Sequence, residues 1–194
     1  GRGGHACLLR VHEDRGGGYR RSTSQIGSNV IKSLGKLGRL LPESLVYELR
    51  RLRYRRQILV RRFVTDEPEF GRLAEWVSEG DCVLDLGANV GHYTCRLSEL
   101  VGASGRVIAV EPVPSTFSML TANFRHFAHS NVTLLNVGAS DTLRLAGLSI
   151  PEFSTGMTNY YMARLVEDGS PMLSALVFPL GFLVDLPRVS LVKI

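Results

Sequence analysis

The chain has 194 residues, 44% of them hydrophobic, and a formal net charge of +5 at pH 7. This length is enough for one domain with its own core, and no apolar run reaches the 18 or more residues that a membrane-spanning helix needs. Cys7, Cys82 and Cys95 are too few and too scattered for a disulfide framework or a zinc site. We therefore expect no metal centre, and a reducing cytoplasm is the default location.

The positive charge is concentrated at the start of the chain. Residues 1–65 hold fifteen Lys and Arg against four Asp and Glu, whereas residues 66–194 hold eight against fourteen. Residues 1–28 are rich in Gly, Arg and Ser without periodicity, so we expect a disordered or non-native basic tail. Residues 29–66 are predicted to form a basic helical segment.

Within that segment, one short helix is predicted near residues 29–40 and a longer one from Pro42 to about Val64. The apolar positions of the longer helix keep helical spacing and are Leu45, Leu49, Leu52, Leu59 and Phe63. Its arginine face over residues 50–62 could make weak contact with an anionic surface, although a solvated helix face is the simpler interpretation. We expect no specific nucleic-acid partner.

From Glu67 onward, helical and extended patterns alternate. The expected order is helix 67–78 with Phe70, Leu73, Ala74 and Val77 facing inward, strand 82–86, helix 90–101, strand 106–111, helix 115–128, strand 132–137, a hairpin or irregular excursion over 143–163, strand 175–179 and strand 190–194. This alternation predicts an α/β fold, with a Rossmann-like, doubly wound, mostly parallel sheet over residues 67–194. We expect three layers and the strand order 3-2-1-4, with strand 82–86 as strand 1.

The turn after strand 82–86 carries the most specific motif. Asp85 is followed by Gly87 and Gly91, and the next strand ends in Glu111. The spacing G-x-x-x-G differs from the G-x-G-x-x-G of dinucleotide sites and favours S-adenosylmethionine (SAM) over NAD. The free N–H groups at the start of the following helix would meet a carboxylate. Asp85 would accept from the ammonium group, directly or through water, and Glu111 from the ribose hydroxyls.

Residues 81–123 closely resemble the FkbM family of SAM-dependent methyltransferases. Its first motif is matched at Asp85, Gly87, Ala88, Asn89, Gly91 and Tyr93, and its second at Glu111, Pro112, Pro114, Phe117, Leu120 and Asn123. Residues 132–141 resemble its third strand and the turn near adenine. The cosubstrate-binding residues expected from the turn and the resemblance are Asp85, Gly87, Ala88, Asn89, Gly91, His92, Tyr93, Glu111, Pro112, Asn136 and Gly138.

The resemblance implies a class I SAM-dependent methyltransferase with SAM as cosubstrate, acting on a hydroxyl oxygen of a small molecule or sugar. Two alternatives stay open: an inactive nucleotide-binding or regulatory module, and an NAD-dependent oxidoreductase. The structural alternative is that the motif is an ordinary strand–turn–helix corner without a ligand.

The chain stops at Ile194, where the family normally continues into an Asp-Val-Glu-Gly-like signature. We therefore interpret it as a fragment whose acceptor-side and catalytic residues are unknown. On this interpretation strand 190–194 would have an unpaired edge, and the 194-residue form would be inactive and marginally stable. Lys193 is expected to lie at a solvated strand end.

Overall fold

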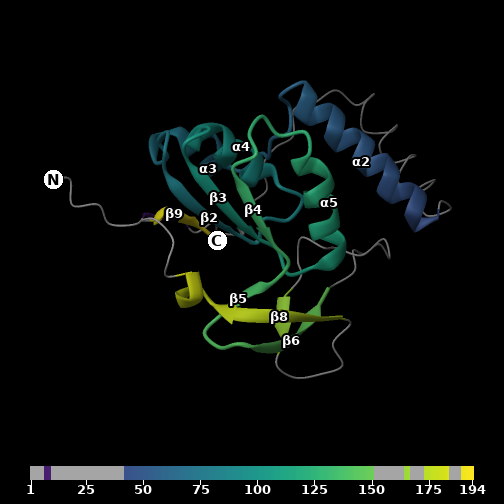
Figure 1. The fold of residues 1–194 in the computed structure, drawn as a ribbon. Coiled ribbons are helices and arrows are strands. Elements are labelled where there is room, and N and C mark those ends of the chain that lie inside the picture. Colours follow the sequence, from purple (N-terminus) through teal and green to yellow (C-terminus); the bar gives the residue numbers. More distant parts are fainter. Residues whose placement is uncertain (1–6, 10–41, 151–163, 167–172, 184–188) are drawn as a thin grey trace.

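The computed structural model describes residues 7–9, 42–150, 164–166, 173–183 and 189–194. Its central sheet has five parallel strands in the order β1-β9-β2-β3-β4 (Figure 1). Their bounds are β1 Cys7–Leu9, β2 Cys82–Leu86, β3 Arg106–Val110, β4 Val132–Leu135 and β9 Val189–Lys193. The predicted order 3-2-1-4 is confirmed as β4-β3-β2-β9, and with it the Rossmann-like parallel sheet.

Strand β1 departs from the expectation that residues 1–28 have no regular structure. Cys7–Leu9 pair in parallel with β9, with Cys7 opposite Leu191 and Leu9 opposite Lys193. The edge of β9 that was expected to be unpaired is therefore covered. The rest of 1–28, and the helix predicted at 29–40, lie outside the described residues.

The helices next to the sheet lie on one of its faces. α4 (His92–Val101) packs on Val83, Val107 and Leu191, and α5 (Pro114–Phe124) packs on Ala109. Both crossovers move the chain the same way across the sheet, so right-handed connections place both helices on the same face. The expected second helical layer is not found among the described residues.

The predicted helix 67–78 is shorter than expected and passes from an α-helix into a 3-10 helix. It consists of α3 (Pro68–Arg72) followed by the 3-10 turn η2 (Leu73–Glu75). Phe70, Leu73 and Val77 are buried as predicted, whereas Ala74 is exposed.

The opposite face of the central sheet meets a second, mixed sheet instead of helices. Its strand order is β5-β8-β6-β7, and its elements are β5 Gly138–Ser140, β6 Arg144–Ser149, β7 Arg164–Val166, β8 Leu173–Pro179 and the 3-10 helix η4 Leu180–Leu183. Leu135, Ala139 and Leu180 pack against the apolar side chains of β2 and β3. Strand β8 was predicted at 175–179. The excursion after β5 contains the ordered strand β6, which pairs antiparallel with β8.

Helix α2 (Glu43–Leu59) forms where predicted but ends at Leu59, before the expected Val64, so Phe63 lies beyond it. It buries the face opposite to its leucines. Tyr47, Tyr54 and Ile58 face the domain, and the hydroxyl groups of Tyr47 and Ser118 on α5 are 3.0 Å apart. At 100° per residue the two tyrosines stand about 180° from the leucine stripe. The exposed leucines are Leu45, Leu49, Leu52 and Leu59.

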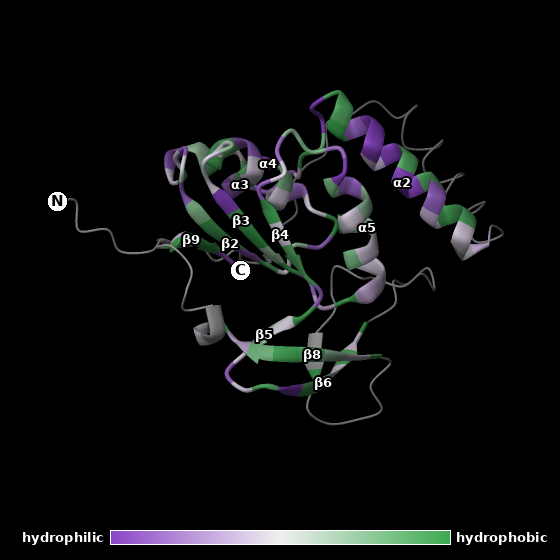
Figure 2. Ribbon diagram, viewed as in Figure 1, coloured by the Kyte–Doolittle hydropathy of each residue, from purple (hydrophilic) through white to green (hydrophobic). Residues whose placement is uncertain are grey.

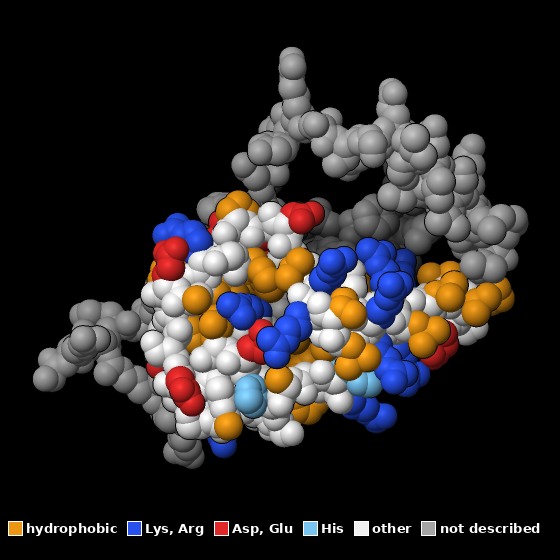
Figure 3. All heavy atoms as spheres, turned by 90° about the horizontal axis from the view of Figure 1, so that it is seen from above, with side chains coloured by type: hydrophobic (Ala, Val, Ile, Leu, Met, Phe, Trp, Pro, Cys, Tyr) orange, Lys and Arg blue, Asp and Glu red, His pale blue; other side chains and the backbone are white. Residues whose placement is uncertain are grey.

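Green and purple residues alternate along α2 in Figure 2, whereas strands β2 and β3 are mostly green, with Asp85 and Arg106 as their charged residues. Figure 3 shows basic and apolar side chains intermixed at the right, where α2 lies. None of the helices in the described ranges is long and apolar enough to cross a membrane.

Candidate functional site

The turn between β2 and α4 holds three residues in the left-handed backbone region. Gly87 has φ 71°, Asn89 φ 51° and Gly91 φ 98°. A Cβ built on Gly87 would meet nothing within 4 Å, whereas one on Gly91 would lie 2.6 Å from Leu120 Cδ1. The two glycines therefore serve different purposes. Gly87 leaves open space where a ligand can approach the backbone, and Gly91 makes room for α5 packing inside the protein, so the ligand-approach role expected for both fits only Gly87.

The end of β3 anchors this turn. The N–H groups of Gly87 and Ala88 both donate to the carbonyl oxygen of Val110, at 2.9 and 3.0 Å. Asn89 N–H donates to Glu111 Oε2 at 2.8 Å. The structure thus brings the glycine turn and Glu111 into direct contact, which is what parallel strands ending at one edge of a sheet predict.

Glu111 is buried, and each of its two carboxylate oxygens accepts one hydrogen bond from a backbone N–H group. Its Oε1 accepts from Val113 N–H at 2.9 Å, and Oε2 accepts from Asn89. Burial raises the pKa of Glu111, and the two backbone N–H groups oppose that shift. Each carboxylate oxygen keeps a second lone pair, so Glu111 can still accept from a pair of neighbouring hydroxyls while it holds the turn.

Asp85 has a different environment from the one the motif suggests. It is 0% exposed. Its Oδ2 accepts from Thr94 Oγ1 at 2.6 Å, and its Oδ1 lies 3.3 Å from Lys193 Nζ. Lys193 is itself buried, not solvated as expected. The carboxylate is therefore part of the inner structure of the turn.

The side chains of His92 and Tyr93 pack against other aromatic rings. His92 stacks on Phe63 with ring centroids 4.1 Å apart, and Tyr54 meets it edge-on at 5.9 Å. Burial, assisted by the charge of Arg53, lowers the pKa of His92 to about 4. Tyr93 is buried and packs edge-on against Phe70, and burial, followed by the neighbouring Glu67, raises the pKa of its phenol. What both residues offer to a ligand is their backbone N–H at the start of α4.

Asn136 contacts the backbone of the loop that carries Glu111 and Pro112. Asn136 Nδ2 donates to the carbonyl oxygens of Glu111 at 2.8 Å and Pro112 at 3.3 Å, so it shapes the loop after β3. Gly138 is buried in β5.

Two residues outside the predicted site also hold the turn. Thr94 is bound to Asp85, and Asn123 donates from Nδ2 to the carbonyl oxygen of Val90 at 2.9 Å. Asn123 belongs to the second family motif, so the sequence offered a reason to consider it. For Thr94 the only indication in the sequence was its position in the first turn of the predicted helix.

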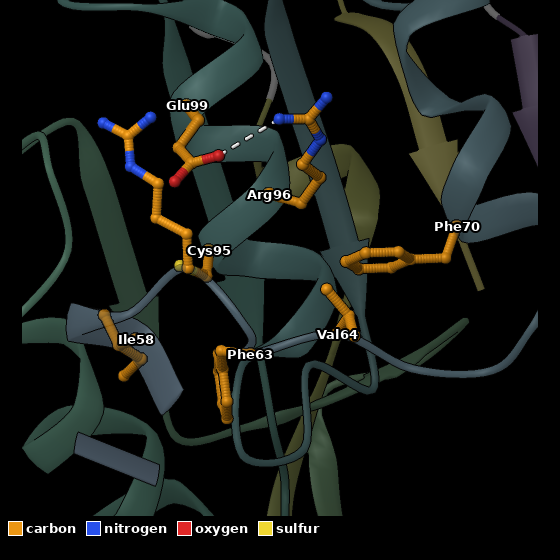
Figure 4. Close-up of a pocket in the computed structure, with 8 residues that line it drawn as sticks. Ile58, Phe63, Val64, Phe70, Cys95, Arg96 and Glu99 are labelled. Atoms are coloured by element: carbon orange, nitrogen blue, oxygen red, sulfur yellow. Dashed lines mark hydrogen bonds and ion pairs between the residues drawn. The ribbon is translucent and has the colours of Figure 1, made fainter. Parts of the chain in front are cut away.

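A separate pocket lies on the outer side of α4 (Figure 4). Ile58, Phe63 and Val64 line it from the segment that ends α2, and Cys95 and Arg96 line it from α4. Burial raises the pKa of the Cys95 thiol to about 12, so this sulfur stays protonated. The pocket combines apolar side chains with the charged Arg61, Arg96 and Glu99, and its lining includes no residue of the glycine turn.

Comparison with known proteins places residues 64–141 in a match to the family model described as protein-L-isoaspartate(D-aspartate) O-methyltransferase. A protein-L-isoaspartate O-methyltransferase from Methanococcus aeolicus is 23% identical over 113 residues, which cover 56% of this chain and 50% of that protein. One from Methanosarcina mazei is 36% identical over 59 residues, covering 30% of this chain and 24% of the relative. The chain thus spans half the length of the first relative and less of the second.

Among solved structures, Aeropyrum pernix fibrillarin with natively bound SAM matches with 28% identity and a TM-score of 0.30, covering 32% of this chain and 26% of the other. The family model and the relatives are named for O-methyltransferases, so this chain is similar over part of its length to part of such enzymes. The matching model is not that of the FkbM family, so that narrower assignment stays a prediction.

Proposed function

We propose that this chain is the cosubstrate-binding part of a SAM-dependent O-methyltransferase. The observation that carries the proposal is the contact between Glu111 and a glycine turn whose Gly87 faces open space at the start of α4. Backbone donors, an open approach and a buried carboxylate together match a ligand that has a carboxylate at one end and a ribose near its middle.

Each group in the site has one role in this proposal. The N–H groups at the start of α4 receive the amino-acid carboxylate, because the first N–H groups of a helix have no partner inside it and the helix dipole favours negative charge. Glu111 accepts from the ribose hydroxyls through its remaining lone pairs. SAM supplies a methyl group on a sulfonium, which a nucleophilic oxygen displaces. The chain's part is to orient that group for in-line attack.

The acceptor oxygen is the finer question. The resemblance to the FkbM family implies a hydroxyl of a small molecule or sugar, whereas the relatives are named for protein isoaspartate. A hydroxyl needs a general base, but a carboxylate is already ionised at neutral pH. The names of the matching family model and of the relatives favour a carboxylate acceptor of the isoaspartyl kind over a hydroxyl.

Two measurements test the proposal. Calorimetry should show binding of SAM and no comparable binding of NAD, and the reverse preference would overturn the cosubstrate assignment. The chain is then incubated with methyl-labelled SAM and an isoaspartyl peptide, the matched aspartyl peptide, or a panel of hydroxylated compounds.

The product identifies the acceptor. A methyl ester is lost in mild alkali, whereas a methyl ether is stable. Alkali-labile label on the isoaspartyl peptide alone supports the carboxylate acceptor, and stable label on a hydroxylated compound supports the hydroxyl. Tight SAM binding without transfer to any acceptor would favour the inactive binding module.

A further inference from the structure

Lys193 is a buried lysine that has no role in the proposed function. It lies in β9 and is 8% exposed. It is the one lysine within the described residues. Removing an ammonium group from water is costly unless it is paired and hydrogen-bonded, so a buried lysine is expected to have specific partners.

Three oxygens lie near the ammonium group. Two of them accept hydrogen bonds from it, and the third, Asp85 Oδ1, lies at ion-pair distance without a hydrogen bond. Nζ lies 3.3 Å from Asp85 Oδ1, and it donates to the carbonyl oxygens of Leu86 at 3.4 Å and Gly87 at 3.2 Å. It also lies 4.8 Å from the centre of the Tyr93 ring. Register explains the approach, because Lys193 is directly opposite Asp85 in the parallel pair of β9 and β2.

These contacts hold the two peptide groups on either side of Gly87 from both ends. Their carbonyl oxygens, on Leu86 and Gly87, accept from Lys193. Their N–H groups, on Gly87 and Ala88, donate to Val110 O. The plane of each peptide is therefore set between β9 on one side and β3 on the other. Gly87 is the residue where the backbone is open to a ligand.

The ion pair with Lys193 also compensates the negative charge of Asp85. One of its oxygens faces Lys193 and the other accepts from Thr94. A fully buried carboxylate with these two partners is not presented to the ammonium group of a ligand. Asp85 then acts on the site through Lys193 and Thr94, and not through contact with the cosubstrate.

We propose that Lys193 is a positioning residue of the cosubstrate site, which orients the peptides around Gly87 for the amino-acid part of SAM. The role rests on the proposed function of the site. It also predicts a selective effect, because the proposed ribose acceptor is Glu111, just after β3. Lys193 makes no hydrogen bond or ion pair with Glu111 among the described residues and acts on it only through its charge, which lowers the pKa of that carboxyl. Losing Lys193 should weaken recognition of the amino-acid part and spare recognition of the nucleoside part.

The test compares two ligands on matched variants of the chain. S-adenosylhomocysteine carries both parts, and 5′-methylthioadenosine lacks the amino-acid part. Lys193→Met keeps the length of the stem and removes the charge. It should weaken binding of S-adenosylhomocysteine by about tenfold or more, as expected for loss of hydrogen bonds from a charged group, and binding of 5′-methylthioadenosine by less than about twofold.

Two further variants separate positioning from folding. Val192→Ala alters the neighbouring residue of β9, which packs on the opposite face, and should leave both affinities unchanged. The double variant Asp85→Asn with Lys193→Met removes both buried charges, so it should regain thermal stability over Lys193→Met alone without regaining discrimination between the ligands. Lys193→Arg keeps the charge and should retain more of that discrimination.

The outcomes are distinguishable. Equal weakening of both ligands by Lys193→Met, or no weakening of either, would overturn the positioning role while leaving the proposed function standing. Failure of the unaltered chain to bind either compound would overturn the proposed function, and the role of Lys193 with it.

Discussion

The glycine turn and helix α2 distribute polar and apolar side chains in opposite ways. The turn buries charged groups: Asp85 is 0% exposed, Glu111 5% and Lys193 8%. Helix α2 exposes leucines, with Leu52 at 58% and Leu59 at 63%. Burial in this protein therefore follows the position of a residue relative to the parallel sheet more closely than it follows polarity.

The two regions also differ in how the cost of burying charged groups is offset. Each buried charge at the turn has a partner within hydrogen-bonding or ion-pair distance, which offsets the cost of removing it from water. Such arrangements are typical of functional sites. On α2 the leucines are exposed, and the ion pair between Arg51 and Glu48 is exposed as well. The predictions below test whether the two regions differ in what a substitution costs.

The largest effect is expected at Gly91. Gly91→Ala places a Cβ against Leu120, which is itself 0% exposed, at a φ of 98° that side chains rarely adopt. We expect a loss of about 2–4 kcal/mol in the free energy of unfolding, from strain and overpacking together. Urea denaturation measures it.

Gly87→Ala is the matched control, since its Cβ meets nothing in the protein. It should cost about 1 kcal/mol from backbone strain alone. The larger Gly87→Val should strongly weaken SAM binding, because its branched side chain enters the open space. Equal losses of stability from Gly91→Ala and Gly87→Ala would contradict the division of labour between the glycines.

A second effect lies at the junction of the two regions, where His92 from α4 stacks on Phe63 after α2. The folded pKa of His92 is about 4, whereas an unfolded histidine has a pKa of about 6.5. Between these values the unfolded chain binds a proton that the folded chain does not. Stability should therefore be complete above about pH 6.5 and fall, by up to roughly 3 kcal/mol, as the pH drops to 4.

His92→Phe keeps an aromatic ring and removes the titration. Denaturation of both forms at pH 7 and pH 4.5 should show a smaller acid-induced loss for the variant. An identical loss in both would mean that other groups control the acid response.

A third effect concerns Glu111, the carboxylate shared by the turn and the proposed ribose site. Glu111→Ala should weaken SAM binding by about 1–3 kcal/mol, because charged-group hydrogen bonds are lost. Calorimetry on variants that retain their circular dichroism spectrum is the measurement. Glu99→Ala removes a carboxylate from the exposed side of α4, where it pairs with Arg96, and serves as the control. Unchanged affinity in Glu111→Ala would remove Glu111 from the site.

The smallest effect is expected on the outer face of α2. Leu52→Gln should change stability by less than about 0.5 kcal/mol, as is usual for exposed positions. Ile58→Ala, on the buried face of the same helix, should cost about 2–4 kcal/mol. A large loss from Leu52→Gln would show that the leucine stripe is covered, and the contrast between the regions would fail.

The sequence was most informative where all residues of an element lie in the same environment. Strand β2 is buried along its whole length, so its apolar run and the following glycines located the strand, the turn and the approach of Glu111. The strand order followed from the alternation of strands and helices.

Helix α2 shows why the rest could not be predicted. It carries two apolar stripes on opposite sides, and the periodicity identifies both without saying which one meets the domain. Lys193 shows a second limit. Its partner Leu86 is 107 residues away, and only the register between β2 and β9 makes a strand-end lysine a buried one.

The order of the strands in the central sheet also has a consequence for folding. Asn89 and Glu111 are 22 residues apart, so the turn and its carboxylate can assemble from neighbouring segments early. Strand β9 joins from much farther along the chain, and closing longer loops slows folding. Since β9 lies between β2 and β1, the first strand in the chain can only be the last one added to the sheet. Until β9 arrives, Asp85 has no cation beside it, so the charge balance of the site is completed late in folding.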